Sequence, residues 1–148
     1  MISSIEFRRF TPDLLHQVTE LSRKNVTEIY SDFIFIDIYY SWPSGFIVAM
    51  ERENVVGFIC GSVNGEKEAR IMIIAVDKEF RGQGIGKRLL ELFEEEAKKL
   101  KVEKMRLEVK TSNKVAINLY KKMGFIISNM LPAYYNDGSD AYVMQKFI

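Results

Sequence analysis

The feature that most constrains the fold is a fully apolar run, IMIIAV at residues 71–76, which is followed by a glycine cluster and then by a long amphipathic stretch that ends at residue 100. The segment ARIMIIAVD has apolar side chains on both faces of a strand, which is typical of a central strand covered on both sides. Residues 84–100 then place apolar side chains at helical spacing, with charged side chains on the opposite face. This pattern predicts an α/β sheet flanked by helices.

Periodicity and turn signals in the rest of the chain predict a mixed α/β sheet. The expected elements, in chain order, are a helix at 11–26 with Thr11 as its N-cap, a short helix in 31–43, strands at 45–50 and 55–62, a strand at 69–77, a helix at 84–100, a strand at 103–110, a short helix from Ser112 or Asn113 to Gly124, and two last strands. No repeat or linker divides them, so we expect a single domain over residues 1–148.

The bulk properties fit one ordinary globular domain of 148 residues, with 47% hydrophobic and 28% charged residues. A net charge of +1 gives no support for nucleic-acid or membrane binding by bulk electrostatics. The chain shows no signal peptide and no apolar run long enough to cross a bilayer, so we expect a cytoplasmic location. The single cysteine, Cys60, excludes an internal disulfide and is expected to be a core residue of a strand. With one histidine and no Cys/His cluster, we expect no metal site.

The glycine cluster RGQGIG, residues 81–86, does not fit two well-known phosphate loops. The G-x-G-x-x-G dinucleotide fingerprint fails at Lys87, and the Walker A pattern fails at Arg81 and Arg88. The missing side chains still let a ligand approach the amide groups, and the positive end of the following helix suits a diphosphate. From the residues alone, a glycine-rich turn that binds nothing remains the alternative.

Two separated motifs resemble the GCN5-related N-acetyltransferases (GNAT). IAVDKEFRGQGIGKRLL resembles their R-x-x-G-x-G pyrophosphate loop, with Arg81, Gly84 and Gly86 at the pattern positions. LEVKTSNKVAINLYKKMGF resembles the second half of the same fold. The resemblance covers nearly the whole chain. It implies a mixed, mostly antiparallel central sheet, with acetyl-coenzyme A as co-substrate and no metal.

The stretches LEVKTSN and AYYNDGSDAYVM are similar to the RimI-like ribosomal-protein alanine acetyltransferases. They are equally similar to catalytic subunits of protein N-terminal acetyltransferases, including archaeal single-subunit ones. NVTEIY and YYSWPSGFIVA resemble the catalytic-subunit group better. The resemblance implies direct acetyl transfer to the N-terminal amine of a protein or peptide, and leaves a ribosomal protein substrate and an auxiliary subunit open. The alternatives are a lysine or small-amine acceptor, and a coenzyme A-binding module without catalysis.

Direct transfer needs a neutral amine, a proton acceptor and a proton donor for the departing thiolate. An α-amino group with a pKa of about 7.7–8.0 is partly neutral at pH 7, whereas a lysine at about 10.4 costs roughly 3.5 kcal/mol more to deprotonate. A modest base therefore suffices for a protein N-terminus. The resemblance implies Glu108 as general base and Tyr120 as general acid. From the residues alone, Glu108 would be a solvated strand glutamate and Tyr120 a packed aromatic.

The resemblance also implies the binding residues. Coenzyme A would lie along the central strand and the glycine loop, with the Val76 N–H as oxyanion donor and Asn113 doubling as a helix cap. Tyrosines would line the peptide site, and Arg70 and Met72 would shape it; hairpin packing is the alternative for the tyrosines. The expected contacts are Ile74, Ala75, Val76, Arg81, Gly82, Gln83, Gly84, Ile85, Gly86, Lys87, Asn113 and Tyr120 for the cofactor, and Glu28, Tyr30, Tyr134 and Tyr135 for the peptide.

Overall fold

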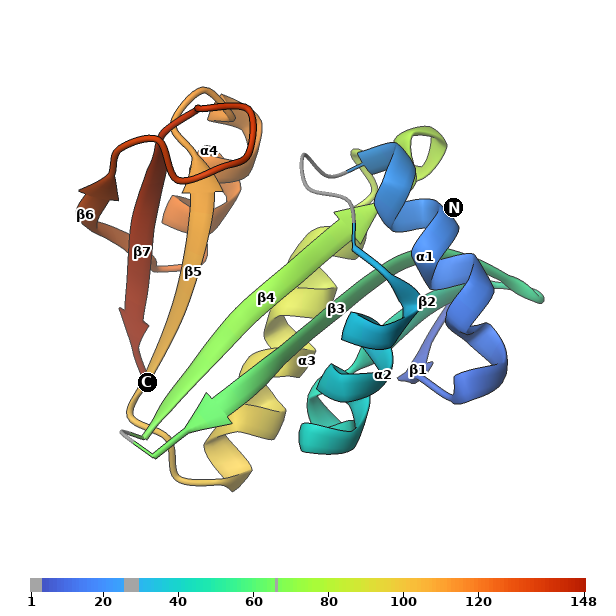
Figure 1. Ribbon diagram of the computed structural model, residues 1–148. Coiled ribbons are helices and arrows are strands. Elements are labelled where there is room, and N and C mark those ends of the chain that lie inside the picture. The colour runs from blue at the N-terminus through green and yellow to red at the C-terminus, as the bar shows by residue number, and fades with distance from the viewer. Residues whose placement is uncertain (1–3, 26–29, 66) are drawn as a thin grey trace.

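The computed structural model describes residues 4–25, 30–65 and 67–148, so Glu28 lies outside the described residues (Figure 1). A seven-stranded sheet has the order β1-β2-β3-β4-β5-β7-β6, and its neighbouring strands run antiparallel except for β4 and β5. This confirms the expected mixed, mostly antiparallel sheet. The elements are β1 (Ile5–Arg9), a 3-10 turn (Pro12–Leu14), α1 (Leu15–Asn25), α2 (Asp32–Ser41), a 3-10 turn (Pro43–Gly45), β2 (Ile47–Glu51), β3 (Asn54–Asn64), β4 (Glu68–Val76), a 3-10 turn (Lys78–Phe80), α3 (Ile85–Lys99), β5 (Lys104–Lys110), α4 (Lys114–Lys122), β6 (Ile126–Leu131) and β7 (Ala141–Phe147).

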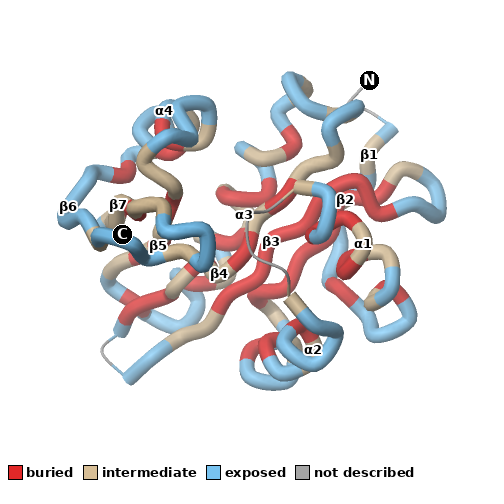
Figure 2. Tube along the Cα trace, turned by 45° about the horizontal axis from the view of Figure 1, so that its top comes forward, coloured by how far each residue is buried: buried red, intermediate tan, exposed pale blue. Residues whose placement is uncertain are grey.

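The helices cover both faces of the sheet. α1 and α2 pack on one face of β3 and β4, and α3 packs on the opposite face (Figure 1). Figure 2 shows the buried stretches running along the central strands and the inner sides of these helices. β4 is fourth of seven strands, which confirms its predicted central position. Cys60 of β3 is fully buried on the α1–α2 face, as its predicted core role requires.

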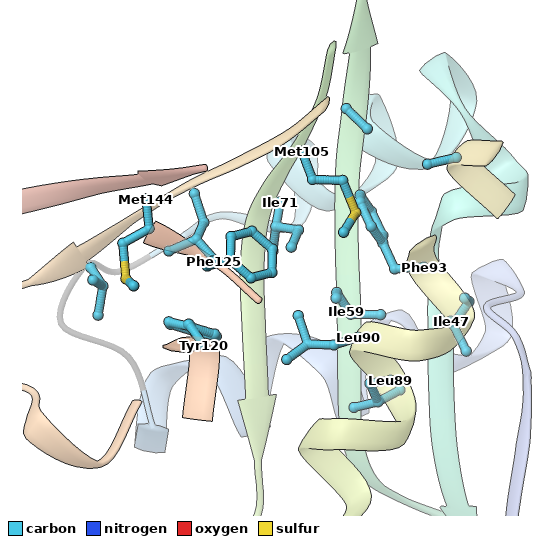
Figure 3. Packing of buried hydrophobic residues seen from close by; sticks show 14 of the residues in the cluster. Ile47, Ile59, Ile71, Leu89, Leu90, Phe93, Met105, Tyr120, Phe125 and Met144 are labelled. Atoms are coloured by element: carbon cyan, nitrogen blue, oxygen red, sulfur yellow. The ribbon is translucent and has the colours of Figure 1, made fainter. Parts of the chain in front are cut away.

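The second half of the chain continues the core on the α3 face. The Tyr120 ring of α4 packs near Phe125, with 6.0 Å between ring centroids, and both join a cluster with Leu90 and Met144 (Figure 3). Alternation along β5 turns Leu107 and its apolar neighbours toward the same cluster. The charged side chains of β5 consequently face the other side of the sheet.

The β4–β5 pair is short and then opens. Only three residue pairs connect the strands, from Glu68 beside Lys104 to Arg70 beside Arg106. Beyond Arg70 the two strands separate toward the glycine loop (Figure 1). These three residue pairs form a short joint between β4 and β5. On the glycine-loop side of this β4–β5 joint the two strands are no longer paired.

A β-bulge in β4 lies where the separation begins. Across β3, Cys60 lies opposite Ile73 and Gly61 lies opposite Ile71, so Met72 is the extra residue. Met72 and Ile73 consequently both face the α1–α2 cluster, although they are consecutive in the strand. Bulges bend and twist the strand that carries them, which favours the departure of β4 from β5.

The predicted element order was wrong at the N-terminus, where β1 pairs with β2 as an edge strand. Thr11 precedes a 3-10 turn, but its side chain makes no capping hydrogen bond, and α1 begins only at Leu15. Asn113 does cap α4, because its Oδ1 accepts a hydrogen bond from Ala116 N at 3.2 Å.

Candidate active site

A cavity of about 150 Å³ lies where β4 and β5 separate. Glu108 of β5 and Tyr120 of α4 both line it, together with Tyr30 and Tyr135. Residues far apart in the sequence, including the predicted acid and base, therefore line one cavity. The full lining is Asn25, Tyr30, Ile71, Met72, Ile73, Ile74, Leu107, Glu108, Val109, Lys110, Asn113, Tyr120 and Tyr135.

The backbone of β4 faces this opening. Asp77 N donates to Val56 O at 2.8 Å, so the main chain of Asp77 is directed toward β3. Main-chain groups of successive residues alternate in direction along an antiparallel pair. The amides and carbonyls of Ile74 and Val76 are therefore directed toward β5, beyond the residues with which β5 pairs. An extended ligand arm could add to β4 here as a further strand does.

The glycine loop lies at the end of β4 and opens α3. Gly82 and Gly84 have φ angles of 77° and 82°, a left-handed conformation that favours glycine, and Gly84 is the N-cap residue of α3. A Cβ added at Gly82 would meet nothing within 4 Å, so the space above this backbone is open. A Cβ at Gly86 would make only ordinary contacts, at 3.5 Å from Leu119 and 3.8 Å from Val76. Open amides at the start of a 15-residue helix suit a diphosphate.

Arg81 fastens the loop to its surroundings. Its Nε donates to Val76 O at 3.3 Å and its Nη2 donates to Asn25 Oδ1 at 2.8 Å. Lys87 is exposed in the first turn of α3, whereas Gln83 Oε1 is buried without a hydrogen-bond partner among the described residues. Among the predicted loop residues, Arg81 therefore links the loop to β4 and to the end of α1 through hydrogen bonds of its side chain.

Glu108 is held between two guanidinium groups. Its Oε1 accepts from Arg70 Nε at 2.9 Å and also from Arg70 Nη2, and its Oε2 lies 3.1 Å from Arg106 Nε without hydrogen-bond alignment. The Glu108 side chain is only 8% exposed, so the solvated alternative is wrong. Burial by itself would lower the pKa of Arg70, but the bonded Glu108 carboxylate outweighs burial and the pKa is raised.

Burial raises the pKa of Tyr120 to about 12. Tyr120 therefore stays protonated at neutral pH, which a proton donor requires. It is a weaker acid than a solvated phenol, so proton transfer to a thiolate whose thiol has the ordinary pKa near 8.5 is correspondingly less favourable. The same burial raises the pKa of a thiol that leaves beside it, which reduces this mismatch.

The two adjacent tyrosines of the β6–β7 loop, Tyr134 and Tyr135, line different cavities. Tyr135 lines the cavity with Glu108, and burial raises its pKa, with smaller contributions from Tyr134 and Glu108. The Tyr134 hydroxyl accepts from Arg70 Nη2 at 3.1 Å, and its ring lies edge-on to Tyr135 at 5.0 Å. Lys110 Nζ bonds Asp137 Oδ2 at 2.7 Å and so ties the same loop to β5.

A second cavity, of about 570 Å³, lies on the face of β5 and β7 away from α3. Glu108 lines both cavities. Arg106 and Lys110 were not predicted as site residues, although the alternation of β5 already placed them on the face of Glu108. Asn25 carried no sequence signal, since its position depends on how α1 packs. The second lining is Arg70, Arg106, Glu108, Ser128, Asn129, Leu131, Tyr134, Val143 and Gln145.

Among the described residues there is no group of three or more His, Cys, Asp or Glu side chains that could hold a metal ion. No helix in the described ranges is long and apolar enough to cross a membrane.

Comparison with known proteins places this geometry in a family. The family model described as the acetyltransferase (GNAT) family matches residues 15–125. An "N-alpha-acetyltransferase" of Sulfurisphaera tokodaii is 34% identical over 140 residues, covering 86% of this chain and 84% of the relative. The crystal structure of Ard1 from Thermoplasma volcanium superposes with a TM-score of 0.94, at 39% identity and 98% coverage of both chains. Chaetomium thermophilum Naa20, solved in complex with a bisubstrate analogue, gives a TM-score of 0.88 at 30% identity, covering 97% of this chain and 86% of Naa20.

Proposed function

Because the chain belongs to the GNAT acetyltransferase family and is an acetyl-coenzyme A-dependent N-acetyltransferase, we propose that its acceptor is the α-amino group of a protein or peptide. The observation that carries the proposal is that Glu108 and Tyr120 line one cavity at the opening between β4 and β5. The named activity of the Sulfurisphaera relative supports the same acceptor.

The described residues fit coenzyme A along its length. The main chain of Ile74 and Val76 is directed into the opening, where it could hold the pantetheine arm. The amides around Gly82 and Gly84 would take the diphosphate. Bound there, acetyl-coenzyme A supplies an acetyl group activated as a thioester.

The protein groups then divide the proton chemistry. As the amine nitrogen forms its bond to the acyl carbon, Glu108 accepts the proton that the nitrogen loses, directly or through a water. The Val76 N–H stabilises the charge that develops on the acyl oxygen. As the carbon–sulfur bond breaks, the Tyr120 hydroxyl gives its proton to the sulfur. The products are an N-acetylated chain and a free thiol, and solvent restores both side chains.

The acceptor is tested with two peptides of the same sequence, each containing one lysine, of which one has a blocked α-amine. Mass spectrometry after incubation with acetyl-coenzyme A should show one acetyl group, on the α-amine of the unblocked peptide only. Acetylation of the blocked peptide at an undiminished rate would point to the lysine acceptor and contradict the proposal.

The roles of the two side chains are tested separately. Glu108→Gln and Tyr120→Phe should each lower kcat by about 10²-fold or more, the usual contribution of a positioned acid or base, while calorimetry shows unchanged coenzyme A affinity. Glu95→Gln and Tyr40→Phe, at exposed helical positions, are the matched controls. Wild-type turnover in both site variants would remove this mechanism.

A further inference from the structure

We propose that the second cavity binds an acidic side chain at the second or third residue of the acceptor peptide. This inference rests on the proposed function and names the class of N-terminus that the site prefers. Glu108 lines both cavities, so an amine that reaches Glu108 from the β6–β7 side carries its following residues through the second cavity. At about 3.3–3.6 Å per extended residue, side chains two and three remain close to the amine.

The face of the sheet determines which side chains an entering peptide meets. Glu108 lies opposite Val143, and Arg106 lies opposite Gln145, so these four side chains share the face away from α3. Arg70 lies beside Arg106 across the β4–β5 joint. Tyr134 completes this wall and bonds Arg70. Two guanidinium groups therefore lie side by side in one polar cavity.

The charges of this wall do not cancel. Among the described lining residues Glu108 is the only carboxylate, and both of its oxygens face guanidinium groups. Behind the wall, Glu68 is 3% exposed and lies 3.5 Å from both Arg106 and Lys104. Three cations (Lys104, Arg70 and Arg106) against two carboxylates (Glu68 and Glu108) leave a local charge of +1. An anion entering this cluster is favoured, and a cation is disfavoured.

The two arginines can also offer hydrogen bonds. Their side chains are 31% and 34% exposed, so they are partly desolvated but still reachable from the cavity. A guanidinium has five N–H donors. The Arg106 Nε is buried against Glu108 Oε2, so a ligand would meet the terminal nitrogens of the arginines. Planar guanidinium groups suit carboxylates in particular. Charge and donor geometry therefore both point to an aspartate or glutamate side chain.

The test uses peptides with a free α-amine that differ only at residue two or only at residue three, as Asp, Asn or Lys. At the selective position we expect kcat/KM for Asp to exceed that for Asn by about tenfold or more, as for a hydrogen bond to a charged group, with Lys below Asn. The preference should shrink as ionic strength rises, because the arginines are partly exposed.

Variants identify the source of the preference. The Asp/Asn ratio of kcat/KM should fall severalfold in Arg106→Gln and less in Arg106→Lys, which keeps the charge but loses the planar group. Arg88→Gln, on α3 beside Glu91 and Glu95, should keep the wild-type ratio. Each ratio is measured within one variant, so a general loss of activity does not affect it. If Arg106→Gln does not fold, the partial loss in Arg106→Lys decides.

The outcomes separate the two proposals. Equal kcat/KM for Asp, Asn and Lys at both positions would overturn the acidic preference and leave α-amine acetylation intact. A wild-type ratio in the Arg106 variants would also overturn it. Absence of α-acetylation on every peptide, with acetylation of lysine instead, would overturn the proposed function itself.

Discussion

At the scale of single residues, Tyr120 shows how burial prepares a side chain for one protonation state. Its ring belongs to the core cluster with Phe125 and Met144, while the side chain also lines the active-site cavity. Desolvation disfavours the phenolate, so Tyr120 remains a donor across the physiological range. The same shift has a consequence for stability at high pH.

We expect the free energy of unfolding to fall between about pH 10 and pH 12 partly because of Tyr120. The unfolded chain releases this proton near pH 10 and the folded chain only at about 12, so the folded state binds more protons within this window. The full contribution is roughly 2–3 kcal/mol, present below pH 10 and lost as pH rises through 12. Urea denaturation at pH 9 and pH 11 should show a smaller loss for Tyr120→Phe than for wild type.

Tyr40→Phe is the control for this measurement, because Tyr40 is 71% exposed and should leave the pH dependence unchanged. Cys60 and Tyr135, whose pKa values are also raised by burial, remain in both proteins and cancel in the comparison. Equal losses of unfolding free energy between pH 9 and pH 11 in wild type and Tyr120→Phe would show that burial does not raise the pKa of Tyr120.

The glycine loop offers a second prediction at this scale. Gly82→Ala and Gly138→Ala both place a side chain at a positive φ with open space around it, so each should cost about 1–2 kcal/mol of stability. Only Gly82 lies in the loop expected to hold the diphosphate. Calorimetry should therefore show weaker coenzyme A binding for Gly82→Ala and wild-type binding for Gly138→Ala. Equal affinities would remove this loop from the binding site.

At the scale of secondary-structure elements, the bulge at Met72 organises β4. It reverses the faces of the strand, so that Ile71 faces the α3 cluster before the bulge and Ile73 faces the α1–α2 cluster after it. Gly61 lies opposite this irregularity on β3. A Cβ there would approach Arg70 O to 2.1 Å and Phe93 Cζ to 2.8 Å, distances that backbone and core cannot accommodate without moving.

Gly61→Ala should therefore destabilise the protein by at least the 1–3 kcal/mol typical of an overpacked core, and displace Arg70 from Glu108. Urea denaturation measures the first effect, and loss of turnover beyond the loss of folded protein measures the second. Gly65→Ala is the matched control, because a Cβ at Gly65 meets nothing within 4 Å. Similar stabilities for the two variants would contradict the role assigned to Gly61.

The elements that local periodicity determines could be predicted from the sequence, and those that depend on pairing could not. α3 and β5 show clear 3.6- and two-residue patterns, and both formed close to the expected residues. β1 has only five residues and is stabilised by β2, about forty residues away, so no local signal marked it. The Met72 bulge depends on register with β3, which a single strand does not encode.

The site shows the same division. The glycine loop and the cap at Asn113 are local features, and the structure has both. The enclosure of Glu108 depends on Arg70, which comes from a different strand and lies 38 residues away. Its neighbour Arg106 could not be predicted as a site residue, because the alternation of β5 does not show what covers that face of the strand. Roles that required a resemblance, such as that of Tyr120, remain predictions.

At the scale of the whole molecule, the sheet consists of two parts joined by three residue pairs between β4 and β5. One part carries α1, α2 and α3, and the other carries α4, β6 and β7 (Figure 1). The active-site cavity lies at the opening between them, so a ligand there contacts both parts. Coenzyme A should therefore act as a structural bridge as well as a reactant.

We expect coenzyme A at a hundred times its Kd to stabilise the protein by about 2.7 kcal/mol, measured as a rise in Tm. Hydrogen exchange should slow at the amides of Ile74 and Val76, and also along β5. Adenosine 3′,5′-bisphosphate, which lacks the pantetheine arm, is the control and should protect the glycine loop alone. Protection by coenzyme A confined to the start of α3 would contradict a bridge between the two parts.

The full burial of Cys60 has a practical consequence for measuring this enzyme. Its thiol is the only one in the chain, and burial raises its pKa, so the reactive thiolate is scarce and enclosed. A chromogenic disulfide reagent added during turnover will therefore report the coenzyme A that is released, with no background from the folded polypeptide. Continuous colorimetric rates can be recorded without first removing or alkylating a cysteine.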